Sequence, residues 1–197
     1  ELFSAVLNEF DFDGIHFFHF MNNTPALAHV AKAADVPYVT SVHDYYSACR
    51  QFNLLGFDKT YCDNTYDRLD DCDICLLRQY NIPAGSQLKR RDYYLEALEN
   101  AASVIFVSDH TRDKYREIYP QLDYSTSRIH GAPIPNSDWR FRRAVQEEPG
   151  EDETRLPRVV ITGNFHENKG ARYFLDALSV CANVRLDFHF HGGVNDS

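Results

Sequence analysis

The chain has 197 residues, a formal net charge of -9 at pH 7 and a hydrophobic fraction of 44%. That fraction is ordinary for a globular protein, and the length allows one large domain or one domain plus part of another. The acidic balance, without any Lys/Arg-rich run, argues against a nucleic-acid partner. Apolar stretches are too short to cross a bilayer, and no signal peptide opens the chain. Because it starts at Glu1 rather than Met, we expect an internal fragment.

The first forty residues alternate helical and extended patterns. Apolar spacing predicts a helix over 2–10, and a run of aromatic residues and histidines predicts a strand over 15–20 that is covered on both faces. A Thr-Pro pair at 24–25 marks the start of a second helix. A β-branched run over 37–42 predicts a second strand. This order indicates an α/β fold with a parallel sheet.

Residues 45–85 break this alternation, because they combine four cysteines and many aspartates with few periodic signals, so we interpret them as a Cys-rich insertion. Beyond it we expect a helix to about 102 with Ser86 as its N-cap, a strand over 103–107, a helix to about 119 with Ser108 as its N-cap, and a strand over 128–130. The cations at 89–91 are expected to form a solvated face. We assign 1–143 to one domain that lacks its amino-terminal part.

A charged segment with proline, glycine and no periodicity, residues 144–157, is typical of a linker. A new unit follows, with a strand over 158–162, a helix whose apolar face includes Phe174, and a strand over 184–190. We interpret 158–197 as the first βαβ of a second, truncated α/β domain.

The strand over 37–42 runs directly into His43 and Asp44. In an open α/β sheet, ligands bind beyond the carboxyl ends of the strands, where this pair is expected to stand. We interpret His43 and Asp44 as the candidate catalytic pair, which contacts sugar hydroxyls or orients a phosphate. The alternative is a histidine that is simply hydrogen-bonded structure at a strand end.

The turn from Gly163 to Gly170 joins a predicted strand to a predicted helix. Free backbone N–H groups and the positive end of that helix make an anion site, to which Lys169 adds a full charge. Gly163, Asn164, Lys169 and Gly170 are therefore candidate phosphate-binding residues. The turn is not a Walker A loop, because glycine follows Lys169, and G-x-G-x-x-G is absent. An ordinary turn with a surface lysine is the alternative.

Four of the five cysteines, Cys49, Cys62, Cys72 and Cys75, lie within the insertion. The C-x-x-C formed by the last two is a common chelating pair, and four thiolates would complete a tetrahedral structural zinc site. Such a site would hold in place a loop that lacks a core of its own. Free thiols and disulfides are the alternatives. A metal with four protein ligands would not be catalytic.

A catalytic metal site built from His16, His19, His189 and His191 lacks support, because no H-E-x-x-H or similar spacing is present. His16 and His19 lie in or next to a predicted buried strand. We therefore expect them to be packed, hydrogen-bonded histidines.

Four segments, in sequence order, resemble the retaining glycosyltransferases of family 4, which have the GT-B fold. Residues 36–46, with the His-Asp pair, are similar to one family motif, and the cysteine stretch resembles a subset of members that continue in this way. Residues 101–108 are similar to a strand that precedes a short helix, and 163–170 to the turn that opens the donor domain.

The resemblance implies two Rossmann-like domains that face a cleft, the first holding the acceptor and the second the nucleotide-sugar donor. A sugar would move, with retention, from a nucleotide-diphosphate sugar to a glycan, lipid-linked or polysaccharide acceptor. His43 would approach the transferred sugar, and Lys169 would neutralise the departing diphosphate. Asn164 departs from the basic residue that many members carry there. The chemistry requires no metal or other cofactor, so structural zinc is the only cofactor considered.

The implied location is cytoplasmic, with peripheral association at the inner face of the membrane as a further option, and the fragment is expected to be inactive by itself. Two rival functions are kept. One is a non-enzymatic binding module organised by a structural zinc loop. The other is a sugar-nucleotide epimerase of the GT-B type.

Overall fold

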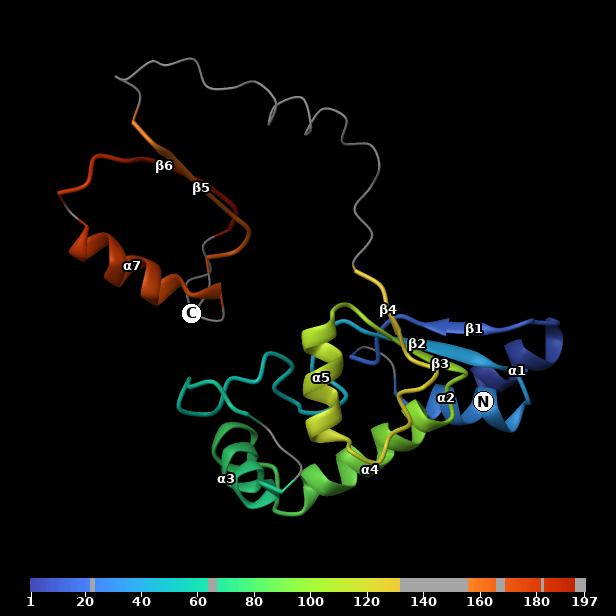
Figure 1. Cartoon of the computed structure of the whole chain (residues 1–197). Coiled ribbons are helices and arrows are strands. Elements are labelled where there is room, and N and C mark those ends of the chain that lie inside the picture. The colour runs from blue at the N-terminus through green and yellow to red at the C-terminus, as the bar shows by residue number, and fades with distance from the viewer. Residues whose placement is uncertain (22–23, 64–66, 132–155, 166–168, 182, 194–197) are drawn as a thin grey trace, which may run out of the picture. The chain divides into compact units, whose positions relative to one another are not determined.

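The computed structural model describes residues 1–21, 24–63, 67–131, 156–165, 169–181 and 183–193. The chain separates into two compact units, Glu1–Pro133 and Ile134–Ser197. Each is an α/β unit (Figure 1). The predicted end of the first domain at 143 lies outside the described residues, and so does all of the predicted linker 144–157 except its last two residues.

The first unit is built on four strands that pair in the order β1-β2-β3-β4, every pair parallel. The predicted α/β class with a parallel, Rossmann-like sheet is therefore confirmed. The elements of this unit are α1 (Leu2–Glu9), β1 (Ile15–Phe17), α2 (Ala26–Ala33), β2 (Tyr38–Val42), α3 (Leu69–Tyr80), α4 (Ser86–Glu99), β3 (Ser103–Phe106), α5 (Asp109–Ile118) and β4 (Arg128–Ile129).

In each strand, alternate side chains point to the face of the sheet that carries the core. Phe17 pairs with Thr40, and Thr40 pairs with Val104, so these three share a face with the residues two positions away. All sheet residues in the two apolar clusters of this unit belong to that face. Helix α4 joins the clusters, because Tyr94 packs in one and Leu98 in the other. The carboxyl ends of the strands are thereby held on a packed base.

The opposite face of the sheet is more open than the sequence predicts. His16 is exposed and Phe18, just beyond β1, is 58% exposed, although the aromatic run predicts a strand covered on both faces. The reason is that β1 is an edge strand and the described helices contribute their core residues to the other face. His16 is hydrogen-bonded, as expected, at 2.8 Å from the Ser41 hydroxyl.

The Cys-rich insertion contains a helix that periodicity does not predict. Helix α3 has Asp70 and Asp71 in its first turn and Arg78 in its last turn, which complements the helix dipole. Its apolar content is too low for a strong periodic signal, and Leu76 is one of only two residues that it buries. In Figure 1 this helix lies beside α4, which it contacts.

Helix α4 corrects three further predictions. Its N-cap is Gly85 rather than Ser86, and it ends at Glu99. Arg91 is 1% exposed, so the cations at its start do not form one solvated face. Arg90 places its guanidinium 4.5 Å from the ring centroids of both Tyr46 and Tyr94. Lys89 alone of the three is exposed.

The cap of α5 agrees with the sequence. The Ser108 hydroxyl accepts a hydrogen bond of 3.1 Å from the backbone N–H of Thr111, as expected of an N-cap serine. The helix that it starts supplies Tyr115 and Ile118 to the core.

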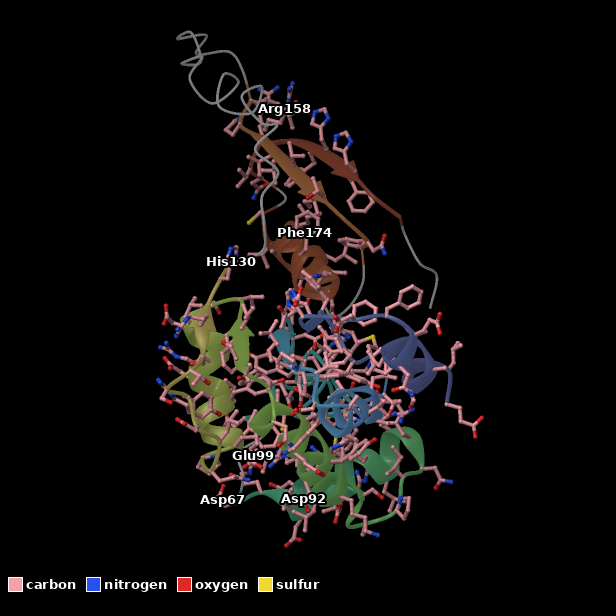
Figure 2. All side chains as sticks on the ribbon, turned by 90° about the vertical axis from the view of Figure 1, so that its right-hand side faces the viewer. Asp67, Asp92, Glu99, His130, Arg158 and Phe174 are labelled. Atoms are coloured by element: carbon pink, nitrogen blue, oxygen red, sulfur yellow. The ribbon has the colours of Figure 1, made fainter. Side chains whose placement is uncertain are left out.

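The second unit contains β5 (Arg158–Thr162), α7 (Ala171–Val180) and β6 (Asp187–His191), and the two strands are parallel. The predicted strand–helix–strand order is confirmed, although β6 begins later than position 184. Arg158 donates to the Asp187 carboxylate at 3.0 Å. Phe174, labelled with Arg158 in Figure 2, packs its ring edge-on against Phe188 at 5.8 Å. Helix α7 has no buried residue.

None of the helices in the described part of the chain has the length and apolar character needed to cross a membrane.

Candidate active site

The carboxyl ends of β1, β2 and β3 meet at one edge of the sheet, because the three strands are parallel neighbours. His19 follows β1, His43 and Asp44 follow β2, and Ser108 follows β3. Such an edge is where ligands bind in open α/β sheets. The sequence predicts His43 and Asp44 at this edge, and in the structure His19 lies beside them.

Asp44 is held by hydrogen bonds on both carboxylate oxygens. Its Oδ1 accepts from the backbone N–H of Tyr46 at 2.8 Å, and its Oδ2 lies 2.9 Å from Nε2 of His19. Both oxygens are thus engaged within the protein. Asp44 is therefore placed to orient the chain that follows β2 rather than to act as an unoccupied base.

The backbone of Met21 selects the tautomer of His19. Its N–H donates to His19 Nδ1 at 2.7 Å, so this nitrogen must carry a lone pair. The ring proton of a neutral imidazole then lies on Nε2, from which it is donated to Asp44. The chain turn after β1 and the carboxylate after β2 are locked together by this arrangement.

His43 is exposed, and its ring is held by stacking rather than by hydrogen bonds. Its imidazole lies 5.7 Å from the Phe18 ring at an interplanar angle of 8°. In the described part of the chain its ring nitrogens have no hydrogen-bond partner. An exposed imidazole that is oriented by stacking can bind a hydroxyl or phosphate oxygen of a ligand.

Two buried tyrosines of the chain after β3 are hydrogen-bonded to the residues that follow β2. The Tyr115 hydroxyl lies 2.6 Å from Ser47 Oγ and donates to the Asp44 carbonyl at 3.1 Å. Burial raises the pKa of Tyr115 well above its usual value, so it stays a neutral donor. Tyr119 donates to the Ser47 carbonyl at 2.7 Å. Sequence reasoning missed these contacts, because they join residues about 70 positions apart.

A larger hollow adjoins the site through Tyr46, which lines both. Its volume is about 590 Å³, and it is walled by tyrosines and two cations, with no carboxylate among its lining residues. These residues are Met21, Thr24, Pro25, Tyr46, Ser86, Lys89, Arg90, Tyr93 and Tyr94. Aromatic walls with a few polar groups are typical of small-molecule sites.

The candidate phosphate-binding turn lies wholly in the second unit. Gly163 has φ of 100° and Gly170 has φ of 80°, both in the left-handed region that favours glycine. Gly163 N–H donates to the His191 carbonyl at 2.9 Å, which fixes the turn at the end of β6. Lys169 is exposed next to the first turn of α7, and Asn164 is exposed after Gly163. Residues 166–168 of the predicted turn lie outside the described residues.

The sequence of the first unit matches the model of Glycosyltransferase Family 4 over residues 2–130, well over half of the chain. The chain belongs to glycosyltransferase family 4. The match includes the His43–Asp44 edge and the Cys-rich insertion, whereas the Lys169 turn lies outside it. A search of curated proteins finds none that matches this chain.

The Cys-rich insertion brings Cys49, Cys62, Cys72 and Cys75 to one small cavity. None of the four forms a disulfide bond in the described part of the chain. Among the described residues, no three histidine, cysteine or acidic side chains are already arranged to hold a metal ion. His189 and His191, considered as metal ligands, stack 6.4 Å apart in the second unit.

Proposed function

We propose that this chain is part of a retaining glycosyltransferase that uses a nucleotide-diphosphate sugar as donor and a glycan, lipid-linked or polysaccharide acceptor. Family membership supports glycosyl transfer in general. The observation that carries the finer proposal is the open imidazole of His43, stacked on Phe18 at the carboxyl edge of the sheet.

In this proposal His43 contacts the transferred sugar. Its ring is oriented by Phe18 and its nitrogens are unengaged, so it can bind a sugar hydroxyl without first breaking a protein hydrogen bond. Asp44 acts as a positioning residue, because its carboxylate ties the backbone after His43 to His19. A carboxamide in its place would keep the shape but lose one of the two accepted bonds.

Lys169 is proposed to bind the donor diphosphate. The leaving nucleoside diphosphate gains negative charge as the glycosidic bond breaks, and a fixed cation at a helix start stabilises that charge. Lys169 has no ion-pair partner in the described part of the chain, so its charge is available. Gly163, Asn164 and Gly170 would contribute backbone and amide groups to the same turn. No metal takes part in this proposal.

The acceptor is proposed to occupy the hollow lined by Lys89, Tyr46 and Tyr93. Sugars stack on aromatic rings, and the hollow shares Tyr46 with the His43 edge. A cytoplasmic location, with peripheral attachment to the inner face of the membrane as the further option, stays a prediction.

The first test is calorimetric titration of UDP, GDP and ADP into the protein that carries this chain. We expect one nucleotide to bind and Lys169→Ala to weaken that binding at least tenfold. Arg185→Ala is the matched control, because Arg185 is an exposed cation of the same unit. It precedes β6, whereas the Lys169 turn is bonded to the carboxyl end of that strand. Equal affinity in all three proteins would contradict the role of Lys169.

A second measurement separates transfer from other sugar-nucleotide chemistry. With the donor thus identified, His43→Ala is expected to retain nucleotide affinity and to lower the transfer rate by two orders of magnitude or more. NMR of the product reports whether the anomeric configuration is retained. Donor isomerisation without transfer would overturn the proposal in favour of an epimerase.

A further inference from the structure

Four cysteines from three separate stretches of the Cys-rich insertion converge on one cavity. Cys49 lies shortly after β2, Cys62 lies in the loop that follows, and Cys72 and Cys75 lie on α3. Two of them are on one helix at a spacing of three, so they face the same side. The remaining cysteine of the chain, Cys181, is exposed in the second unit and takes no part.

The size of the cavity restricts what it can hold. Its volume is about 30 Å³, whereas pockets for organic ligands measure roughly 300–1,000 Å³. A water-sized occupant needs roughly 10–15 Å³, so there is room for a single ion or one or two waters. Leu54 and Leu76 contribute apolar wall, and water would find few polar partners there.

Two of the four sulfurs already accept backbone hydrogen bonds of the kind that stabilise thiolates. The N–H of Gln51 donates to Cys49 Sγ at 3.3 Å, and the backbone of Phe57 is bonded to Cys75. Outer hydrogen bonds of this kind orient metal ligands and favour their charged form.

The loop between β2 and α3 is held unevenly. Its first part is bonded to the rest of the unit, for example through Tyr119 to the Ser47 carbonyl and through Tyr80 to Gln51. Residues 52–62 contain an isolated antiparallel bridge between Leu55 and Tyr61, turn hydrogen bonds and a contact of Phe57 with the guanidinium of Arg78. Nevertheless, Leu54 is 1% exposed with a φ of 55°, in the left-handed region where a branched side chain is strained. A cross-link at the cavity would hold this strained, irregular chain against α3.

We propose that Cys49, Cys62, Cys72 and Cys75 form a structural zinc site that fixes the Cys-rich insertion against α3. Four sulfur ligands in tetrahedral geometry are a preferred environment for zinc, with Zn–S distances of about 2.3 Å. Each thiol that coordinates releases its proton to solvent. Since the sulfurs do not yet stand in a metal-holding arrangement, they must close in around the cavity when the ion binds.

Two arginines of α4 lie near the proposed site. Arg91 is buried and interacts electrostatically with Cys72, and Arg90 interacts in the same way with Cys49. Zinc with four thiolates would carry a net negative charge, which nearby cations would offset.

The site is tested by the metal content of the chain purified under reducing conditions, without metal-affinity resins and with zinc in the growth medium. Elemental analysis is expected to find about one zinc per chain. Cys75→Ser should lose most of that zinc, whereas Cys181→Ser, the matched control, should retain it. Replacing zinc by cobalt(II) should give the charge-transfer and d–d absorption of a tetrahedral thiolate site, a readout that is independent of the variants.

Several outcomes would overturn the proposal. The first is a folded chain that contains no zinc and whose four thiols all react with a thiol reagent. The second is a mass that shows disulfides among the four cysteines. The third is iron in place of zinc. If Cys75→Ser does not fold, the cobalt spectrum of the unaltered chain still decides. Metal content does not depend on glycosyl transfer, so this result and that for the donor site are separable.

Discussion

The two units share one local pattern of parallel strands joined by helices, but they differ in how well they bury their apolar side chains. In the first unit Phe106, Tyr115 and Ile118 are 0% exposed. In the second, α7 buries no residue, and Tyr173 is 76% exposed. Local pattern is therefore enough to form the elements, whereas burial requires several elements to pack on one another.

The difference has a bearing on the two proposed site regions. His43 follows a strand whose base is anchored by Tyr115 and by the pairing of Asp44 with His19. Lys169 precedes a helix that has no such base among the described residues. The sheet edge of the first unit is thus the better anchored of the two candidate site regions.

Matched leucines on two helices should give the largest contrast. Leu98 on α4 is 2% exposed and Leu175 on α7 is 55% exposed. Leu98→Ala is expected to lower the free energy of unfolding by about 2–5 kcal/mol, because it leaves a cavity in a packed core. Leu175→Ala should change it by less than about 0.5 kcal/mol. Urea unfolding followed by circular dichroism measures both, and similar losses would show that the units do not differ.

Alkaline pH should give a smaller effect that is again confined to the first unit. Burial raises the pKa of Tyr38 to about 12 and that of Tyr94 to about 12, from 10.0. The folded state therefore keeps phenol protons that the unfolded chain releases near pH 10, so stability is complete below that pH and falls as pH rises toward 12.

The measurement for this prediction is the free energy of unfolding between pH 9 and 12, for which the tyrosine pKa values set the window. Tyr94→Phe should reduce the decline, because it removes one of the buried tyrosines whose raised pKa contributes to it. Tyr173→Phe, at an exposed position of the second unit, should not alter it. An unchanged slope in Tyr94→Phe would contradict the assignment.

Helix capping should give the smallest contrast. Ser108→Ala removes the hydroxyl that accepts from Thr111 N–H, and we expect a loss of about 1 kcal/mol. Ser179→Ala is the matched control on α7, where the hydroxyl donates only to the Asp176 carbonyl at an exposed position. That change should be close to neutral in the same urea experiment. A control loss as large as that of Ser108→Ala would remove the distinction.

The sequence was most informative where the signal is local. The β-branched run that became β2 and the N-cap serine of α5 are each decided by a few neighbouring residues, and both were predicted correctly. The position of His43 and Asp44 at the sheet edge followed from strand order alone. Helix α3 was missed because its periodicity is weak, although Asp70, Asp71 and Arg78 mark its ends by charge.

The pairing of His19 with Asp44 could not be predicted from the sequence. The two residues are 25 positions apart, and their contact depends on the register between β1 and β2, which periodicity does not determine. The burial of Arg91 has the same cause, because the position of α4 against the sheet is a property of the packed unit. Long-range register and helix placement therefore account for most of what was missed.

Gly163 also constrains the strand that follows it in the sheet. A side-chain carbon at Gly192 would overlap the carbonyl oxygen of Gly163, so the chain leaving β6 passes the turn backbone to backbone. Phe165 N–H is bonded to the Gly193 carbonyl at 2.9 Å, which closes the contact on the other side. The turn after β5 and the turn after β6 are therefore coupled. A side chain added at position 192 would displace the proposed diphosphate-binding turn from the end of the sheet.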